Sequence, residues 1–227
     1  MQMLVADPKD LETEFLNRIT DPDFPCVGAK SAVAKDHLKV LAAHNIGSGW
    51  DDLRIHRELI DWVEDYRRNP KNFRSLAVIF EGPDDLDEIS FETAMWERLQ
   101  SLADKDYWLG QPYDRRVNAD AEDPHFSLSF GGEAFFVVGL HPQASRPARR
   151  FRHPALVFNL HDQFERLRAE GKYERMRDTI LVRDRKLSGS LNPMLALHGE
   201  SSEARQYSGR CVEEDWRCPF HDPRAEP

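Results

Sequence analysis

The chain has 227 residues, 40% of them hydrophobic and 10% aromatic, which is enough to build one large domain or two small ones. Its net charge of −9 argues against a nucleic-acid partner, because binding phosphates requires a broad basic face. There is no run of about 18 apolar residues, which excludes a membrane-spanning helix, and the first residues lack the pattern of a signal peptide. We therefore expect a cytoplasmic protein without a membrane partner.

The first half of the chain is predicted to be mainly helical, because its apolar residues recur at helical spacing. The two prolines of D-P-D-F-P, residues 21–25, require a turn, since proline disfavours helix in the residue before it. Ser90 or Asp87 is the expected N-cap of the last of these helices. The predicted helices cover residues 9–20, 29–45, 50–68 and 90–102, and a short apolar strand, residues 75–80, precedes the last one.

Strands dominate the middle of the chain. Residues 125–130 alternate between apolar and polar, residues 134–140 are nearly all apolar, and Gly131-Gly132 between them is a signal for a two-residue hairpin. A further strand is expected at 156–159. A helix over 161–185, broken near Gly171, follows it.

The fold class follows from this order of elements. Strands that come as a run between helical blocks, with at least one hairpin, predict an α+β fold with an antiparallel or mixed central sheet flanked by helices. No linker divides the chain, so residues 1–227 are expected to form a single domain. The last forty residues are rich in glycine, proline and serine and are expected to form a long ordered loop region.

The segment G-L-H-P-Q-A-S-R-P-A-R-R-F, residues 139–151, carries the clearest chemical signal. His141 ends an apolar strand and is followed by proline, and three arginines lie within nine residues of it: Arg146, Arg149 and Arg150. Imidazole is a common heme ligand, and arginine binds carboxylates such as the heme propionates. The same residues would suit a general base acting on an anionic substrate. A purely structural role, with backbone contacts for His141 and ion pairs for the arginines, is the more common explanation of such a pattern.

Other residues compete for these roles. Cys26 in F-P-C-V-G and His161 in N-L-H-D-Q-F-E are alternative iron ligands, although a buried cysteine and a helix-start histidine are both common structural features. Ser208 and Arg210, in Y-S-G-R, offer hydrogen-bond donors to an anion. The fingerprints of nucleotide-binding loops, of serine hydrolases and of zinc proteases are missing from the sequence.

The cysteines do not form a recognisable framework. Cys26, Cys211 and Cys218 are odd in number and irregularly spaced, unlike the cysteines of secreted disulfide scaffolds. Cys211, Cys218 and His221 are zinc-ligand types, but their spacing matches no common zinc finger.

Several segments, taken together, resemble one known family. They occur in a fixed order over about residues 24–220: F-P-C-V-G-A-K-S-A, G-L-H-P-Q-A-S-R-P-A-R-R-F, L-V-F-N-L-H-D-Q-F-E-R-L-R, N-P-M-L-A-L-H-G-E-S-S-E-A-R-Q-Y-S-G-R and W-R-C-P-F. This combination resembles the YqcI/YcgG family. Much of that family is uncharacterised, and its better-understood members are heme-dependent N-hydroxylases of guanidino groups.

The resemblance implies a heme b enzyme that N-hydroxylates arginine or a related guanidino compound with dioxygen or peroxide and an electron donor. His141 is then the expected iron ligand, with Cys26 and His161 as the alternatives. Donors for the propionates would be Arg146, Arg149, Arg150, Ser208 and Arg210. A carboxylate that orients the guanidinium would come from Glu133, Glu200 or Glu203.

Two other functions remain open at this point. One is a heme- or ligand-binding protein without turnover, and the other is a hydrolase or transferase with His141 as its base. The oligomeric state is also open, and a homodimer is one option.

Overall fold

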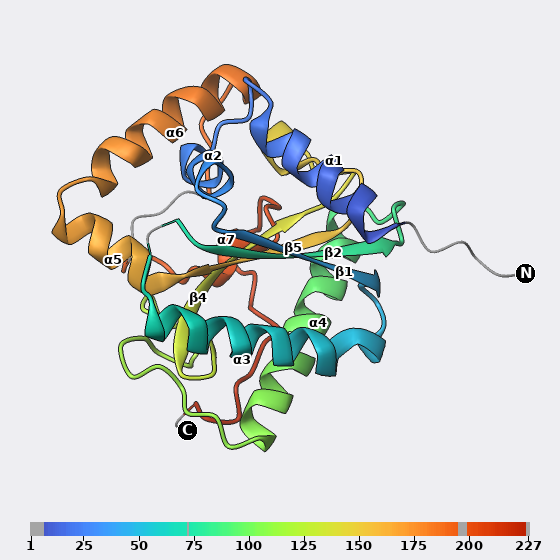
Figure 1. The fold of residues 1–227 in the computed structure, drawn as a ribbon, viewed down its shortest axis with the longest axis vertical. Coiled ribbons are helices and arrows are strands. Elements are labelled where there is room, and N and C mark those ends of the chain that lie inside the picture. Colours follow the sequence, from blue (N-terminus) through green and yellow to red (C-terminus); the bar gives the residue numbers. More distant parts are fainter. Residues whose placement is uncertain (1–6, 72, 195–198, 226–227) are drawn as a thin grey trace, which may run out of the picture.

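A computed structural model describes residues 7–71, 73–194 and 199–225 and contains a mixed five-stranded sheet (Figure 1). The strands lie in the order β1-β2-β5-β4-β3. β1 runs parallel to β2, and the other neighbours are antiparallel. The bounds are Leu38–Asn45 for β1, Ser75–Gly82 for β2, Leu128–Phe130 for β3, Glu133–Leu140 for β4 and Ala155–Leu160 for β5. The predicted α+β class with a mixed sheet is confirmed.

Helices cover both faces of this sheet. Figure 1 shows the sheet edge-on, with α1, α2 and α6 on one side and α3 and α4 on the other. The bounds are Pro8–Thr20 for α1, Val27–Ala34 for α2, Asp52–Arg68 for α3, Glu88–Trp108 for α4, His161–Ala169 for α5, Tyr173–Ser188 for α6 and Ala204–Tyr207 for α7. None of the helices in the described part of the chain has both the length and the apolarity that a membrane crossing requires.

The central strand β2 shows why two helical layers form. All residues from Ser75 to Phe80 are buried. Leu76 and Val78 pack in a core with α3 and α4, whereas Ala77 and Ile79 pack in a second core with α1. A strand that is buried on both faces has a continuous apolar sequence, and helices have to cover both faces of its sheet.

The predicted helix over 29–45 is wrong in its second half. The helix α2 ends at Ala34, and Asp36 then takes a positive φ of 54° in a turn that leads into β1. The sequence L-K-V-L-A-A-H-N of β1 is rich in residues that also suit a helix. Pairing along the whole of β2 satisfies its backbone groups, and this tertiary contact overrides the local preference.

The other predicted elements are found, but α4 runs six residues past the predicted end at 102, and β3 covers only residues 128–130 of the strand predicted over 125–130. β3 and β4 form the hairpin, in which Gly131 and Gly132 have φ values of 59° and 77° that favour glycine. Asp87 caps α4 by accepting a hydrogen bond from the Ser90 N–H at 2.7 Å. The helix expected over 161–185 is divided into α5 and α6, with Gly171 between them.

Residues 199–225 form a strap, mostly of loops as predicted for the C-terminal region, on the α4 side of the molecule. α7 is its only helix among the described residues after α6. Arg210 pairs with Glu92 of α4 at 2.9 Å, and Arg224 pairs with Asp106 at the far end of the same helix at 2.8 Å.

Gly139 of β4 lies where the sheet meets both α4 and the strap. A Cβ at this position would lie 2.8 Å from the Phe91 ring and 3.0 Å from the Tyr207 carbonyl oxygen. Gly139→Ala is therefore expected to lower the free energy of unfolding by about 1–3 kcal/mol, measured by urea denaturation. In the control Gly28→Ala the nearest atoms are 3.7 Å away, so no steric loss is expected, and stability should stay the same or rise because alanine is the better helix former in α2. Equal losses in the two variants would contradict the steric explanation.

Candidate functional site

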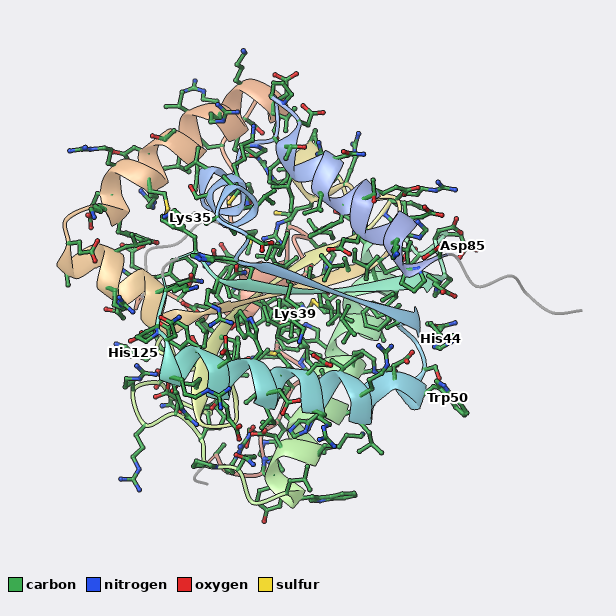
Figure 2. All side chains as sticks on the ribbon, viewed as in Figure 1. Lys35, Lys39, His44, Trp50, Asp85 and His125 are labelled. Atoms are coloured by element: carbon green, nitrogen blue, oxygen red, sulfur yellow. The ribbon has the colours of Figure 1, made fainter. Side chains whose placement is uncertain are left out.

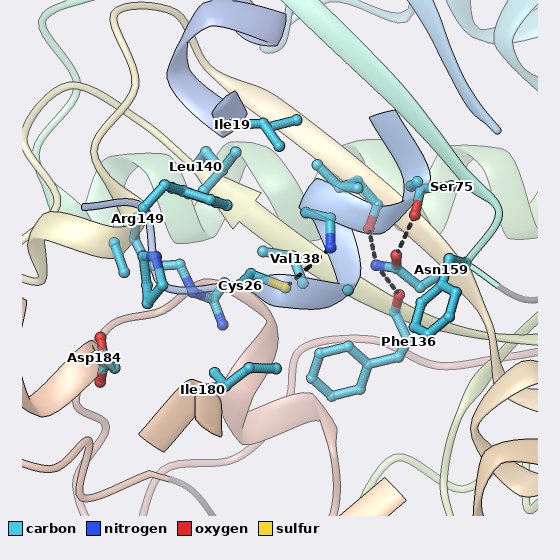
Figure 3. Close-up of a pocket in the computed structure, with 18 of the residues that line it drawn as sticks. Ile19, Cys26, Ser75, Phe136, Val138, Leu140, Arg149, Asn159, Ile180 and Asp184 are labelled. Atoms are coloured by element: carbon cyan, nitrogen blue, oxygen red, sulfur yellow. Dashed lines mark hydrogen bonds between the residues drawn. The ribbon is translucent and has the colours of Figure 1, made fainter. Parts of the chain in front are cut away.

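An apolar cavity of about 290 Å³ lies between the sheet and the layer of α1, α2 and α6 (Figure 3). Its volume is at the lower end of the range of small-molecule pockets, about 300–1,000 Å³. The walls are largely aliphatic and aromatic side chains from β4, β5, α1 and α6, including Phe15, Ile19, Phe136, Val138, Val157 and Ile180. Figure 3 shows Ser75 and Asn159 at one end, joined by a 2.7 Å hydrogen bond.

Cys26 places a thiol in this cavity. It is the N-cap of α2, where its Sγ accepts a hydrogen bond from the Ala29 N–H at 3.4 Å. Burial raises the pKa of the Cys26 thiol, while the N–H groups of Ala29 and Gly28 and the charge of Arg149 act in the opposite direction. Burial therefore favours the neutral thiol, and the helix N-terminus and the Arg149 guanidinium only partly oppose it; a metal ion that binds Sγ would displace the thiol proton.

Arg149 holds a positive charge beside this thiol. Its guanidinium donates to three backbone carbonyls, those of Gly139 at 3.0 Å, Tyr207 at 3.1 Å and Gln206 at 3.0 Å. Burial lowers the pKa of Arg149 to about 10, although the charge of Asp184 opposes this. Because carbonyls fix the side chain without neutralising it, its charge stays available to an anion in the cavity.

Positive charge predominates around the cavity. Four arginines belong to the lining, and three of them donate mainly to backbone carbonyls: Arg18 to Arg150 and Pro147, Arg150 to Ala144 and Ser145, and Arg149 as above. The fourth, Arg146, pairs with Asp184, the one carboxylate among the described lining residues. Such an excess of guanidinium groups suits a ligand with anionic substituents.

His141 lies outside this lining, on the other face of the sheet. Its ring stacks on Phe91 of α4, with the centroids 4.3 Å apart, and the residue is 1% exposed. Strand geometry explains the placement, because successive side chains alternate between faces and Leu140 lines the cavity. His141 as iron ligand stays a prediction, and of the three predicted ligands only Cys26 lines the cavity.

The surroundings of His141 predict a pH effect on stability. Burial lowers the pKa of the His141 imidazole. The negative charge of Glu88 and a hydrogen bond with the Leu86 backbone raise this pKa, but by less. His141 therefore binds a proton more readily in the unfolded chain than in the folded one. Its contribution to the free energy of unfolding is complete above the unfolded pKa of about 6.5, and it is lost as the pH falls from that value toward the folded pKa. His141→Gln is expected to flatten the urea-derived stability profile between about pH 7 and 5. The control His125→Gln, at an exposed histidine, should keep the wild-type slope, and an unchanged slope in His141→Gln would contradict this assignment.

The other predicted ligand and anion donors lie in the α4 side of the molecule. His161 Nε2 is 3.5 Å from Glu203 Oε1, and Glu203 Oε2 accepts a 2.6 Å hydrogen bond from the Ser127 hydroxyl. Ser208 donates to Glu92 at 2.9 Å, and Arg210 pairs with the same carboxylate. These contacts hold the C-terminal strap against α4 and the sheet.

None of the three predicted catalytic glutamates lies among the described lining residues. Glu133 pairs with Arg67 at 2.8 Å and Arg116 at 2.7 Å, Glu203 is buried as described above, and Glu200 is exposed. Their catalytic role stays a prediction.

The cavity's own acid, Asp184, was not predicted. A sequence signal for it exists, because Met176, Ile180 and Asp184 follow one another at four-residue spacing on one face of α6.

No histidine belongs to the described lining of the cavity. His44 and His125 project at the periphery of the molecule (Figure 2), and His198 is outside the described residues. A hydrolase built on His141 therefore finds no imidazole in this cavity. Across the described ranges, no three His, Cys, Asp or Glu side chains are grouped so that they could hold a metal ion, and this includes Cys211, Cys218 and His221.

The chemistry of the lining fits a heme. The group needs a single axial ligand, apolar contacts for the ring and donors for two carboxylates. In the cavity, Cys26 could be the axial ligand, the aliphatic and aromatic walls could contact the ring, and Arg149 and Arg150 could donate to the two carboxylates.

Comparison with known proteins places this site in a family context. The sequence model of the YqcI/YcgG family matches residues 15–221. "Uncharacterized protein YcgG" of Bacillus subtilis (strain 168) is 26% identical over 211 residues, which is 87% of this chain and 80% of that protein. "Putative N(omega)-hydroxy-L-arginine synthase DcsA" of Streptomyces lavendulae is 28% identical over 167 residues, which is 69% of this chain and 60% of that protein. No solved structure matches. With nearly its whole length matched by the family model, the chain belongs to the YqcI/YcgG family.

Proposed function

We propose that this protein is a heme-dependent N-hydroxylase of the guanidino group of arginine or a related small molecule. The observation that carries the proposal is the cavity in which Cys26 faces apolar walls and a positive charge on Arg149. The name of the Streptomyces relative, "Putative N(omega)-hydroxy-L-arginine synthase DcsA", supports the choice of reaction and substrate. The net charge of −9 is compatible with a cationic substrate.

The residues divide the work of holding the cofactor. Cys26 would ligate the iron through Sγ, from a position that the backbone of α2 fixes. Arg149 and Arg150 would bind the propionates, with Arg146 and Arg18 close to them in the lining. When bound, a heme with a thiolate ligand supplies the activation of oxygen that an N-hydroxylation needs.

The protein itself would fix the Arg149 guanidinium and exclude water from the cavity. The carbonyls of Gly139, Gln206 and Tyr207 hold the Arg149 guanidinium without a mobile counter-ion. Phe136, Val138 and Leu140 form an apolar wall that keeps water away from the reacting groups.

The overall reaction balances with two outside electrons. Dioxygen, two electrons and two protons convert the guanidino N–H to N–OH and release water. With hydrogen peroxide as the oxidant, the same product and water form without an electron donor.

The test begins with the absorption spectrum and iron content of protein purified from heme-supplied cells. We expect a Soret band and about one iron per chain. Incubation with arginine and either a reductant in air or peroxide is then expected to add the mass of one oxygen. A protein without heme would overturn the proposal. A heme protein that oxidises none of a panel of guanidines would be a binding protein without turnover.

A further inference from the structure

One acidic side chain reaches the cavity. Among the described lining residues Asp184 is the only acid, and it lies on α6, one turn after Ile180. The residue is 6% exposed. Figure 3 shows Asp184 at the end of the cavity opposite Ser75 and Asn159.

Asp184 already binds a guanidinium group. Arg146 donates through a single nitrogen, Nη2, to Asp184 Oδ2 and also donates to the Ser190 carbonyl at 3.1 Å. The other carboxylate oxygen accepts a long hydrogen bond of 3.3 Å from the Ser188 hydroxyl. An ionised carboxylate can accept about four hydrogen bonds and can bind a guanidinium through two parallel ones, so these contacts leave capacity unused.

The charges of the lining restrict where a cation can sit. Guanidinium groups remain protonated at neutral pH. Arg18, Arg149 and Arg150 repel such a group from the rest of the cavity. The only negative charge in the described lining is that of Asp184, which Arg146 already shares, so the α6 end is the one part of the cavity where a carboxylate can offset the charge of a cationic substrate.

We propose that Asp184 is the specificity-determining residue that receives the guanidinium of the substrate, beside the guanidinium of Arg146 that it already binds. The inference rests on the proposed function, from which it takes the guanidino substrate. A planar guanidinium can satisfy both carboxylate oxygens at once, whereas a lysine ammonium is a point charge and a neutral ureido group lacks the charge. Arginine is therefore expected to bind more tightly than lysine or citrulline.

The test compares two asparagine substitutions on the same helix by isothermal titration calorimetry with L-arginine. Asp184→Asn is expected to weaken binding by more than about tenfold, because it removes a charge-assisted hydrogen bond. Asp178→Asn is the matched control, since Asp178 is an exposed residue of α6 outside the lining, and wild-type affinity is expected for it. Asp184→Glu keeps the charge and should recover part of the affinity. Heme content is measured in parallel and should be equal in all four proteins.

The outcomes separate this inference from the proposed function. Wild-type affinity in Asp184→Asn would overturn the role of Asp184 and leave the N-hydroxylase proposal standing. A wild-type protein that contains no heme and binds no guanidine would overturn both.

A second variant applies if Asp184→Asn does not fold. Arg146→Ala leaves Asp184 without its internal guanidinium, so L-arginine at about 10 mM is expected to raise the Tm of this variant more than that of the wild type. Equal Tm shifts would contradict the proposal.

Discussion

Cys26→Ser is expected to reduce the heme content of the purified protein to less than about a tenth of the wild-type value, because it removes the iron ligand offered by the cavity. Serine keeps the size of the side chain and can still cap α2, so the helix should form. Pyridine hemochrome analysis of protein from heme-supplied cells measures the stoichiometry, and circular dichroism confirms the fold.

Two further variants make this result specific. Cys211→Ser changes an exposed cysteine outside the cavity and should retain its heme. His141→Ala should also retain heme, since its ring packs on Phe91 on the other face of the sheet. If His141→Ala loses heme and Cys26→Ser keeps it, the iron is bound by His141 and the cavity beside Cys26 is not the heme site.

Asp106→Ala is expected to cost about 3–5 kcal/mol in the free energy of unfolding. This carboxylate is fully buried at the end of α4, and it accepts from Arg224 at 2.8 Å and from the Gly131 N–H at 3.0 Å, with His56 Nε2 2.8 Å away. Removing it leaves a buried guanidinium whose remaining carboxylate partner is Asp222. It also removes the carboxylate that joins the Gly131 N–H of the β3–β4 hairpin to Arg224 of the C-terminal strap. Urea denaturation followed by tryptophan fluorescence measures the loss.

The matched control for this prediction is Asp61→Ala on α3. Asp61 is exposed, and its distance to Arg57 is 3.9 Å, so a change within about 0.5 kcal/mol is expected. A loss of the same small size in Asp106→Ala would show that the buried network does not hold the strap.

Most of the fold could be predicted from local sequence signals. The prediction failed where the local sequence fits two kinds of secondary structure. The glycine pair 131–132, the apolar run of β4 and the helical spacing of α3 each reflect a period or turn that neighbouring residues determine. β1 was missed because its alanines and its lysine fit a helix equally well. Only the pairing with β2, about 37 residues away in the sequence, decides in favour of a strand.

The presence of an arginine-rich site could be predicted from the sequence, but only some of the residues that line it. Arg146, Arg149 and Arg150 do line the cavity, because the loop after β4 turns back over its α1 side. His141 was favoured for its position at a strand end, but a shift of one residue along a strand changes the face on which a side chain lies. Asp184 lies more than thirty residues further along the chain, and only the packing of α6 on η2, the short 3-10 helix Pro147–Arg149, brings it to Arg146.

The origin of the cavity walls has a consequence for how the protein is made. Phe15 and Cys26 emerge from the ribosome early, the floor of β4 and β5 comes in the second half, and Ile180 and Asp184 follow near the end. A chain released in order from its N-terminus therefore exposes the apolar face of its sheet until α6 closes over it, and such transient exposure favours aggregation. The cofactor we propose can be enclosed only after α6 has been synthesised, so its supply during or just after translation would set the yield of heme-loaded protein.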